Sequence, residues 1–258
     1  MSVSSALSMN KSFRDSAIVL RTQNLGETDR IIVMCTREHG IVHAVAKGVR
    51  RSSSKFGARL EPFMLVDFSA SGGKKLATIS QVVTRRAYAA PIAADYGVFT
   101  VAAVICELAE QLVQNDQEAG SGQFSLLAGA LSALARRSHS PYRILDSYIA
   151  RSFSLAGWGL ATSACGICAS FDDLNYFSAE VGVLCQNCGR GNLVQRVTPI
   201  SEDTPAYLTA LKAGDWETVG TLGTAYSLSV KSSRLMMEYA QWHLERPLKT
   251  LAILEKES

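Results

Sequence analysis

The stretch of sequence that decides the fold of the first third of the chain is residues 17–46, AIVLRTQNLGETDRIIVMCTREHGIVHAVA. It contains three apolar runs rich in β-branched residues, at 17–20, 31–35 and 41–46. Turn-forming sequence separates them, with Gly26 after the first run and Gly40 between the second and the third. Short apolar runs bounded by Gly, Asn and Asp are typical of β-strands joined by tight turns. The stretch therefore predicts three consecutive strands.

Two further runs, at 63–68 and 76–79, extend this pattern across a Ser71-Gly72-Gly73 turn. Five strands within about 70 residues fit a small closed barrel, because the connecting loops are short and closure removes the free sheet edges. The five-stranded oligonucleotide-binding fold (OB-fold) is the main candidate, and a five-stranded SH3-like barrel would give a similar pattern. We therefore predict an N-terminal barrel domain over residues 1–88, and the strand pattern alone leaves the barrel type open.

Charge is distributed unevenly along the 258 residues, although the whole chain carries only +3. Residues 1–88 hold 14 Lys and Arg against 6 Asp and Glu, a net +8, whereas the remainder holds 12 against 17, a net −5. A positive field concentrated at one end of a chain attracts polyanions. This asymmetry indicates a nucleic-acid partner for the N-terminal domain.

The strongest charge signal is a loop that follows the third predicted strand. It carries five cations and no acidic residue: Lys47, Arg50, Arg51, Lys55 and Arg59. Gly48, Gly57 and the serines at 52–54 leave its backbone adaptable, so the loop can follow a phosphate backbone. Four more cations extend this surface if the fold brings them together: Lys74, Lys75, Arg85 and Arg86. The alternative interpretation is a loop of ordinary solvated charges.

Phe56 lies inside this basic loop. An aromatic ring among cations is a candidate for stacking on a nucleobase. An apolar residue that anchors the loop to the barrel explains it equally well. The sequence leaves both interpretations open.

After Pro91 the apolar spacing changes from a period of two to the helical period. Apolar residues at 98, 101, 102, 105, 108, 109 and 112 share one helical face, which predicts a helix that ends near residues 115–116. Similar patterns predict helices at 124–137, 141–156, 204–212 and 228–246, with Pro247 ending or kinking the last one. The predicted fold class is therefore α+β, a β-barrel followed by an all-α domain over residues 89–258.

The most specific motif in the chain is a set of four cysteines with the spacing C-x2-C-x16-C-x2-C: Cys165, Cys168, Cys185 and Cys188. Two such pairs supply four thiolates for a tetrahedral zinc ion, and Gly166 and Gly189 are expected to permit tight turns around it. Two short apolar segments in the spacer, at 176–177 and 181–184, predict a zinc ribbon inserted at about residues 163–192. Redox activity is the rival interpretation, but one dithiol would suffice for it. Because four protein ligands leave no open coordination position, we expect one structural Zn²⁺ ion.

The sequence shows no apolar run of the ~18 residues needed to span a membrane and no secretory signal at its start, so we expect a cytoplasmic protein. The four histidines are dispersed, and the motifs of nucleophilic, nucleotide-binding and zinc-deaminase sites are absent. We therefore expect no enzymatic activity, with a zinc-dependent nucleic-acid enzyme and a protein-interaction scaffold as the alternatives. The isolated Cys35 and Cys106 are expected to be buried apolar residues.

Several segments together resemble the RecO family of DNA repair and recombination mediator proteins. They are GETDRI at 26–31, TREHG at 36–40, AVAKGVRR at 44–51, FGARLEPF at 56–63, the four-cysteine segment, and WHLERPLK at 242–249. The resemblance covers most of the chain. It implies an N-terminal OB-fold barrel followed by a helical domain with an inserted zinc ribbon.

The resemblance also implies a function in the RecF pathway. Members of the family bind single- and double-stranded DNA, associate with RecR, and engage the C-terminal tail of the single-stranded DNA-binding protein. They promote strand annealing and help RecA load on coated DNA. By position, the loop at 47–59 would contact phosphates and the four cysteines would bind zinc, in a nucleoid-associated bacterial protein that needs no membrane.

Overall fold

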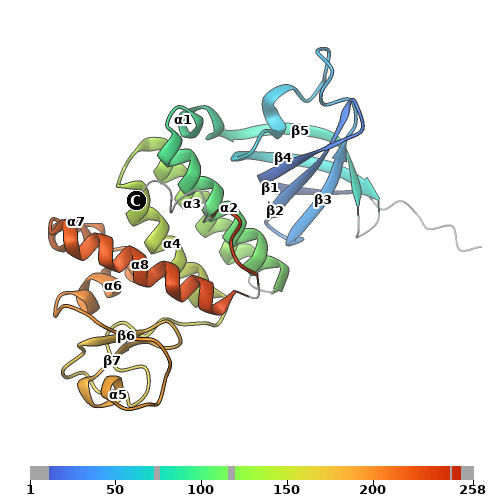
Figure 1. Cartoon of the computed structure of the whole chain (residues 1–258). Helices are drawn as coiled ribbons and strands as arrows, with labels where there is room; N and C mark the ends of the chain where they lie inside the picture. The colour runs from blue at the N-terminus through green and yellow to red at the C-terminus, as the bar shows by residue number, and fades with distance from the viewer. Residues whose placement is uncertain (1–11, 73–75, 116–119, 245, 251–258) are drawn as a thin grey trace, which may run out of the picture. The chain divides into compact units, whose positions relative to one another are not determined.

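The computed structural model describes residues 12–72, 76–115, 120–244 and 246–250. These residues fall into two compact units, divided after Ala90 (Figure 1). The N-terminal unit is built from strands and the C-terminal unit mainly from helices. The predicted α+β organisation is confirmed.

Five strands form a closed barrel in the N-terminal unit: β1 (Ser12–Leu25), β2 (Asp29–Thr36), β3 (Ile41–Ala46), β4 (Met64–Gly72) and β5 (Ala77–Ala87). Their order around the barrel is β1-β2-β3-β5-β4, and pairing of β4 with β1 closes it. Neighbouring strands are antiparallel, except that β3 and β5 pair in parallel near Ala44 and Ala77. All five predicted strands are confirmed.

Strands β1 and β5 are longer than the apolar runs that predicted them. The first part of β1 pairs with β4 and the rest pairs with β2, and its register shifts between Val19 and Arg21. Strand β5 pairs with β4 along its whole length. Backbone hydrogen bonds to these partners hold polar residues in the extended conformation. The apolar runs therefore predict strands that are shorter than the real ones.

The barrel interior is filled by side chains that alternate along the strands, among them Val19, Ile32, Met34, Val66 and Phe68. A short 3₁₀ helix, η1 (Gly57–Leu60), packs on this core through Leu60. Phe56, directly before η1, belongs to the same core and is only 2% exposed. Its ring anchors the loop, so the base-stacking interpretation of Phe56 is wrong.

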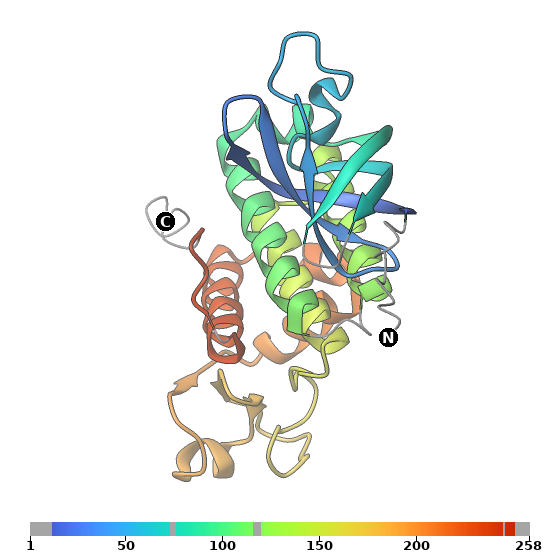
Figure 2. The same ribbon diagram turned by 90° about the vertical axis from the view of Figure 1, so that its right-hand side faces the viewer.

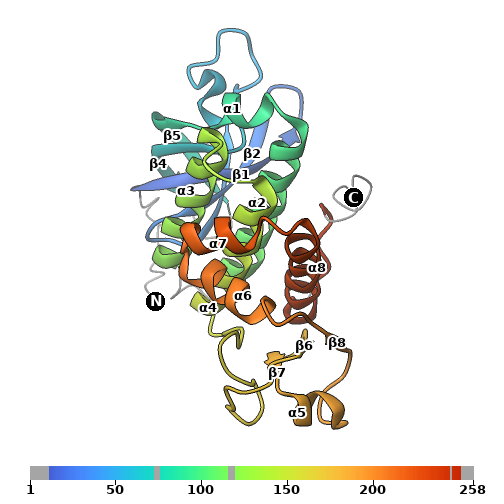
Figure 3. The same ribbon diagram turned by 90° about the vertical axis from the view of Figure 1, so that its left-hand side faces the viewer.

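The helices of the C-terminal unit are arranged about one central helix, on which four of the others pack. They are α1 (Ala89–Ala93), which spans the division, α2 (Tyr96–Asn115), α3 (Gly120–Arg136), α4 (Pro141–Leu155), α6 (Thr204–Ala213), α7 (Trp216–Leu222) and α8 (Tyr226–His243). Helix α4 packs against α2, α3, α6 and α8 (Figure 3). Consecutive residues from Ile144 to Ala150 are buried on it, because neighbours cover it from several sides.

Two helical details differ from the prediction. Helix α8 ends at His243 and not at residue 246, since a residue that precedes proline, here Arg246, is disfavoured in the helical conformation. Helix α7 was missed because it has only seven residues. Its signal is present in the sequence, since Gly214 ends α6 with a φ of 73° and Asp215 caps α7 by accepting a hydrogen bond from the Thr218 amide at 3.1 Å.

Helix α2 is long and apolar enough, over 96–114, to cross a membrane by length and composition alone. Most of this stretch is buried inside the helical unit. Its residues Val101, Ile105 and Leu108 are fully buried, so α2 has the character of a core helix.

A small three-stranded sheet interrupts the helices between α4 and α6. It consists of β6 (Tyr176–Ser178), β7 (Gly182–Leu184) and β8 (Val197–Pro199), in the order β7-β6-β8. The short helix α5 (Gln186–Arg190) lies between β7 and β8 along the chain. Strands β6 and β7 correspond to the two predicted segments. Strand β8 was not predicted and lies beyond the expected limit at residue 192, because three residues ending in a proline give no periodic signal.

Asp146 is a buried acid on the central helix, only 1% exposed. Its Oδ2 accepts a hydrogen bond from the Ser233 hydroxyl on α8. Burial raises the pKa of this carboxyl to about 7, although the Ser233 hydrogen bond and the charge of Arg143 act in the opposite direction. Asp146 is therefore a pH-dependent element of the helical core.

Replacement of Asp146 by Asn is expected to stabilise the protein at pH 8. A raised native pKa makes folding take up a proton, so the contribution of Asp146 is complete below about pH 4 and is lost as the pH rises to about 7. The amide of the introduced Asn would mimic the neutral acid and keep an acceptor for Ser233. Denaturant unfolding of wild type and Asp146→Asn from pH 4 to pH 8 should show a stability difference that grows with pH by a few kcal/mol. A difference that does not vary with pH would contradict this assignment.

Candidate nucleic-acid interface and metal centre

The basic loop leaves the barrel at the end of β3 and projects from the N-terminal unit (Figure 2). Its five cations are all exposed to solvent: Lys47, Arg50, Arg51, Lys55 and Arg59. No acidic residue interrupts them along residues 47–60. The structure therefore presents them as a cationic segment that a polyanion can reach.

The first half of the loop is fixed to the turn between β1 and β2. The Gly48 amide donates to Asp29 Oδ1 at 2.8 Å, and the Arg50 amide donates to the Thr28 carbonyl at 2.9 Å. The hydrogen bond from Gly48, followed by that from Thr28, holds the pKa of Asp29 below its usual value. The Arg50 guanidinium also donates to the Gly26 carbonyl at 3.2 Å. Asp29 is thus a positioning residue for the loop, and it stays ionised at neutral pH.

The second half of the loop is fixed to β5. Lys55 Nζ donates to the Ser80 carbonyl at 3.1 Å and lies 5.0 Å from the centre of the Phe56 ring. Arg59 Nη1 donates to the Lys55 carbonyl at 2.8 Å. Carbonyl contacts leave the positive charges of both side chains in place, because neither forms an ion pair with an acid among the described residues. Both can still attract phosphate.

The remaining predicted cations differ in their surroundings. Arg85 and Arg86 lie on β5, further along the strand that Lys55 touches. Arg85 Nε forms an ion pair with Asp67 Oδ2 at 2.7 Å, which reduces its local field, whereas Arg86 donates to the Arg85 carbonyl. Lys74 and Lys75 lie outside the described residues. The nucleic-acid contacts of all nine cations stay a prediction.

The four predicted metal ligands come together in the ribbon of the helical unit. The sulfur atoms of Cys165, Cys168, Cys185 and Cys188 lie within 4.8 Å of one another, and those of Cys168 and Cys185 are 3.7 Å apart. A Zn–S distance of about 2.3 Å gives a tetrahedron with edges of about 3.8 Å. The donor set therefore fits one tetrahedral metal ion.

The two glycines next to the ligands leave room for close packing around the Cys-x2-Cys turns. A Cβ at Gly189 would lie 2.5 Å from Tyr176 Cδ2, and a Cβ at Gly166 would lie 2.7 Å from the Val181 carbonyl oxygen. The Gly166 amide also donates to the Val183 carbonyl at 2.9 Å. Glycine is needed because Tyr176 of β6 and the turn before β7 pack directly against the two Cys-x2-Cys turns, and neither glycine has a positive φ.

The pKa values of two thiols in the cluster are shifted in opposite directions. Burial alone would raise the pKa of Cys165, but hydrogen bonds from the backbone amides of Cys168, Cys185 and Ile167 outweigh it and lower the pKa to about 6. Burial, followed by the neighbouring thiols, raises the pKa of Cys188 to about 12. Four adjacent thiolates repel one another, and a bound cation would compensate that charge. All four positions of such an ion would be taken by protein sulfur, so it would hold the ribbon together and activate no water.

Two consecutive parts of the chain match two family models. Residues 9–88 match the recombination protein O N-terminal model, and residues 93–252 match the recombination protein O C-terminal model. The chain belongs to the recombination protein O (RecO) family. The resemblance found in the sequence is confirmed.

Individual RecO relatives extend over nearly the whole chain. The DNA repair protein RecO of Bifidobacterium animalis is 42% identical over 244 residues, which is 94% of this chain and 99% of the relative. The DNA repair protein RecO of Cutibacterium acnes is 42% identical over 250 residues, 95% of this chain and 99% of the relative. The RecO protein of Thermobifida fusca is 38% identical over 245 residues, 95% and 98% of the two chains.

Removal of two cluster ligands is expected to abolish metal binding by this RecO chain. The Cys165→Ser/Cys188→Ser variant should lose one ion per chain in elemental analysis, because two remaining thiolates cannot complete a tetrahedral site. The matched control is Cys106→Ala, which removes a buried cysteine of α2 outside the cluster. Retention of one ion per chain by the double variant would contradict the assignment.

Proposed function

We propose that this protein is a DNA repair and recombination mediator that binds nucleic-acid backbones through the N-terminal barrel and promotes strand annealing. The observation that carries the proposal is the basic loop, with five exposed cations uninterrupted by acid on a closed five-stranded barrel. RecO family membership of the whole chain supports it. The proposed DNA-binding domain is residues 1–88, and the proposed contacts are the nine predicted cations.

The strand order supports an OB-fold assignment over an SH3-like barrel. In the order β1-β2-β3-β5-β4, the chain passes from β3 across to β4 and returns with β5 parallel to β3. This is the Greek-key closure of an oligonucleotide-binding barrel. The basic loop is the β3–β4 connection, and its hydrogen bonds to Gly26 and Thr28 place it beside the β1–β2 turn, one of the loops that such barrels use for ligands.

The chemistry of annealing needs no bond to be made or broken. Two single strands repel each other through their phosphates, and a cationic surface that binds backbones lowers that repulsion. Phosphate contacts carry no sequence information, so the base edges stay free to pair. We therefore propose a mediator without enzymatic activity.

The pathway and partners follow from the family and are part of the proposal. The protein would act in the RecF pathway of a bacterial cytoplasm, near the nucleoid, and bind single- and double-stranded DNA together with RecR. It would engage the C-terminal tail of the single-stranded DNA-binding protein and help RecA load on coated DNA. The ion of the four-cysteine site would be Zn²⁺, since four thiolates without an open position are typical of structural zinc.

Neutralising the basic loop is expected to weaken the salt dependence of DNA binding. Each phosphate contact on a single strand contributes about −0.7 to the log–log slope, so five contacts give about −3.5 and the Arg50→Ala/Arg51→Ala/Lys55→Ala variant should lose about 2 of that slope. Fluorescence anisotropy with a labelled single-stranded oligonucleotide over a salt series measures it. Lys231→Ala/Arg234→Ala, which removes two exposed cations from α8, is the control and should keep the slope.

An annealing assay on complementary strands coated with single-stranded DNA-binding protein completes the test. Wild type should accelerate pairing and the loop variant should not. Equal slopes for wild type and the loop variant would refute the proposal and favour a protein-interaction scaffold, in which these cations are merely solvated.

A further inference from the structure

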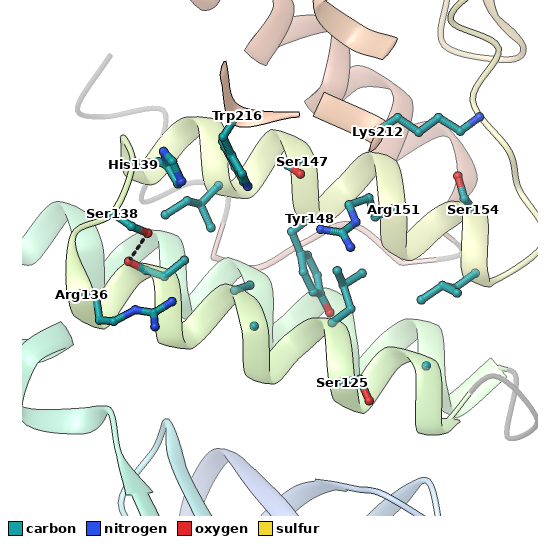
Figure 4. A pocket seen from close by; sticks show the side chains of 17 residues that line it. Ser125, Arg136, Ser138, His139, Ser147, Tyr148, Arg151, Ser154, Lys212 and Trp216 are labelled. Carbon is teal, nitrogen blue, oxygen red and sulfur yellow. Dashed lines mark hydrogen bonds between the residues drawn. The ribbon is translucent and has the colours of Figure 1, made fainter. Parts of the chain in front are cut away.

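A cleft of about 800 Å³ opens within the helical unit between α3 and α4 (Figure 4). Residues of α6 and α7, Lys212 and Trp216, complete its wall. Small residues keep it open, since Gly122, Gly129 and Ala133 lie on the face of α3 that lines it. None of the residues that line the cleft belongs to the basic loop or to the four-cysteine site.

The charge of the cleft is opposite to that of the unit that contains it. Among its described lining residues are Arg136, Arg151 and Lys212, and none is Asp or Glu. Residues 89–258 as a whole carry 12 basic against 17 acidic residues. Concentration of positive charge in a concave site of an otherwise acidic unit indicates an anionic ligand.

The two arginines approach the cleft from opposite ends. Figure 4 shows their guanidinium groups extending toward each other along the α3–α4 trough. Arg136 ends α3, and Arg151 lies ten residues after Pro141, the first residue of α4. At 1.5 Å per residue, Arg151 lies about 15 Å along α4 from the start of that helix. Among the described residues, neither guanidinium has a hydrogen bond or an ion pair, whereas Lys212 Nζ donates to the Leu160 carbonyl at 2.8 Å.

A flat aromatic surface lies at the Arg136 end of the cleft. The rings of His139 and Trp216 are stacked, with centroids 4.0 Å apart and an interplanar angle of 9°. Burial, followed by the charge of Arg143, lowers the pKa of His139, which favours the neutral form of its imidazole. A neutral stacked pair does not repel the arginines, and its outer face is a surface of the kind on which nucleobases stack.

We propose that the α3–α4 cleft binds a second segment of single-stranded nucleic acid, with phosphates on Arg136 and Arg151 and a base against the His139–Trp216 pair. The two arginines lie at different points along the α3–α4 trough, so a backbone segment with more than one phosphate can contact both. A role for this cleft as the site of the second strand in annealing rests on the proposed function. The binding of an oligonucleotide in the cleft is independent of it.

Charge and aromatic stacking together favour nucleic acid over an acidic peptide. A peptide with carboxylates would use the arginines but would have no need of a flat neutral platform beside them. A single strand uses both, because every base has a π-face and every nucleotide has a phosphate. The peptide is therefore the alternative occupant that the experiment must separate.

The test compares three variants of the full chain: Arg136→Ala/Arg151→Ala in the cleft, Arg50→Ala/Arg51→Ala/Lys55→Ala in the loop, and Lys231→Ala/Arg234→Ala on α8 as the control. Titration with an eight-nucleotide oligothymidylate, followed by calorimetry, should give two sites per chain for wild type and the control. The cleft and loop variants should each give one. The cleft variant should also lose about 1.4 from the salt slope, at about 0.7 per contact.

Tryptophan fluorescence provides a second readout that folding defects do not imitate. Oligonucleotide binding should quench Trp216, and Trp216→Phe, which keeps an aromatic ring, should remove that part of the quenching. Arg136→Lys/Arg151→Lys should restore the second site, because it restores both charges. Circular dichroism and thermal unfolding confirm that each variant is folded.

The outcomes separate this proposal from the proposed function. Two sites in the cleft variant, with the wild-type slope, would overturn the cleft proposal and leave the loop proposal standing if the loop variant is defective. Unchanged binding in both variants would overturn both. Arginine-dependent binding of a synthetic acidic peptide with a free C-terminal carboxylate, together with unchanged oligonucleotide stoichiometry, would assign the cleft to a peptide and overturn the nucleic-acid proposal.

Discussion

The pairing of β1 with two neighbours is the constraint on which the N-terminal unit depends. One strand of 14 residues pairs with β4 at one end and β2 at the other, and this closes the sheet. A closed sheet has no edge for another strand to join, so ligands must meet the loops or the outer face. The cationic loop gains its position from the same closure, since one half bonds to the β1–β2 turn and the other half to β5. Its charge is therefore presented on a supported backbone.

The helical unit depends on α4 in a comparable way. Because four helices pack on it, α4 carries both an acid buried in the core and one wall of the cationic cleft. Asp146 and Arg151 lie on different sides of this one helix and face opposite environments. One side of α4 therefore packs in the core while the other side lines the cleft. Because core packing holds α4 rigid, it also fixes the positions of the residues that α4 contributes to the cleft.

The features that the sequence predicts well are those with a local signal. The five strands are bounded by turn-forming residues, and the spacing of the four cysteines is enough to predict that their sulfur atoms cluster as metal ligands. Features that need tertiary information were missed or left open. The burial of Phe56 depends on the barrel interior that η1 covers, and β8 exists only because β6 offers it an edge. The cleft escaped detection since Arg136, Arg151 and Trp216 lie on separate helices, each looking like an ordinary surface or core position along the chain.

The distribution of the six cysteines has a practical consequence. Cys35 and Cys106 are buried in the barrel and in α2, and burial, with a smaller contribution from Asp15, raises the pKa of Cys35 to about 12. Thiol reagents attack thiolates that solvent can reach, so these two side chains are silent in the native protein. Cys168, in contrast, is exposed, and its neighbour in the ribbon, Cys165, is buried but has a lowered pKa. A native-state alkylation time course followed by mass spectrometry would therefore report selectively on the ribbon. The rate of alkylation of the protein's own cysteines would therefore show whether the ribbon is folded, without any introduced label.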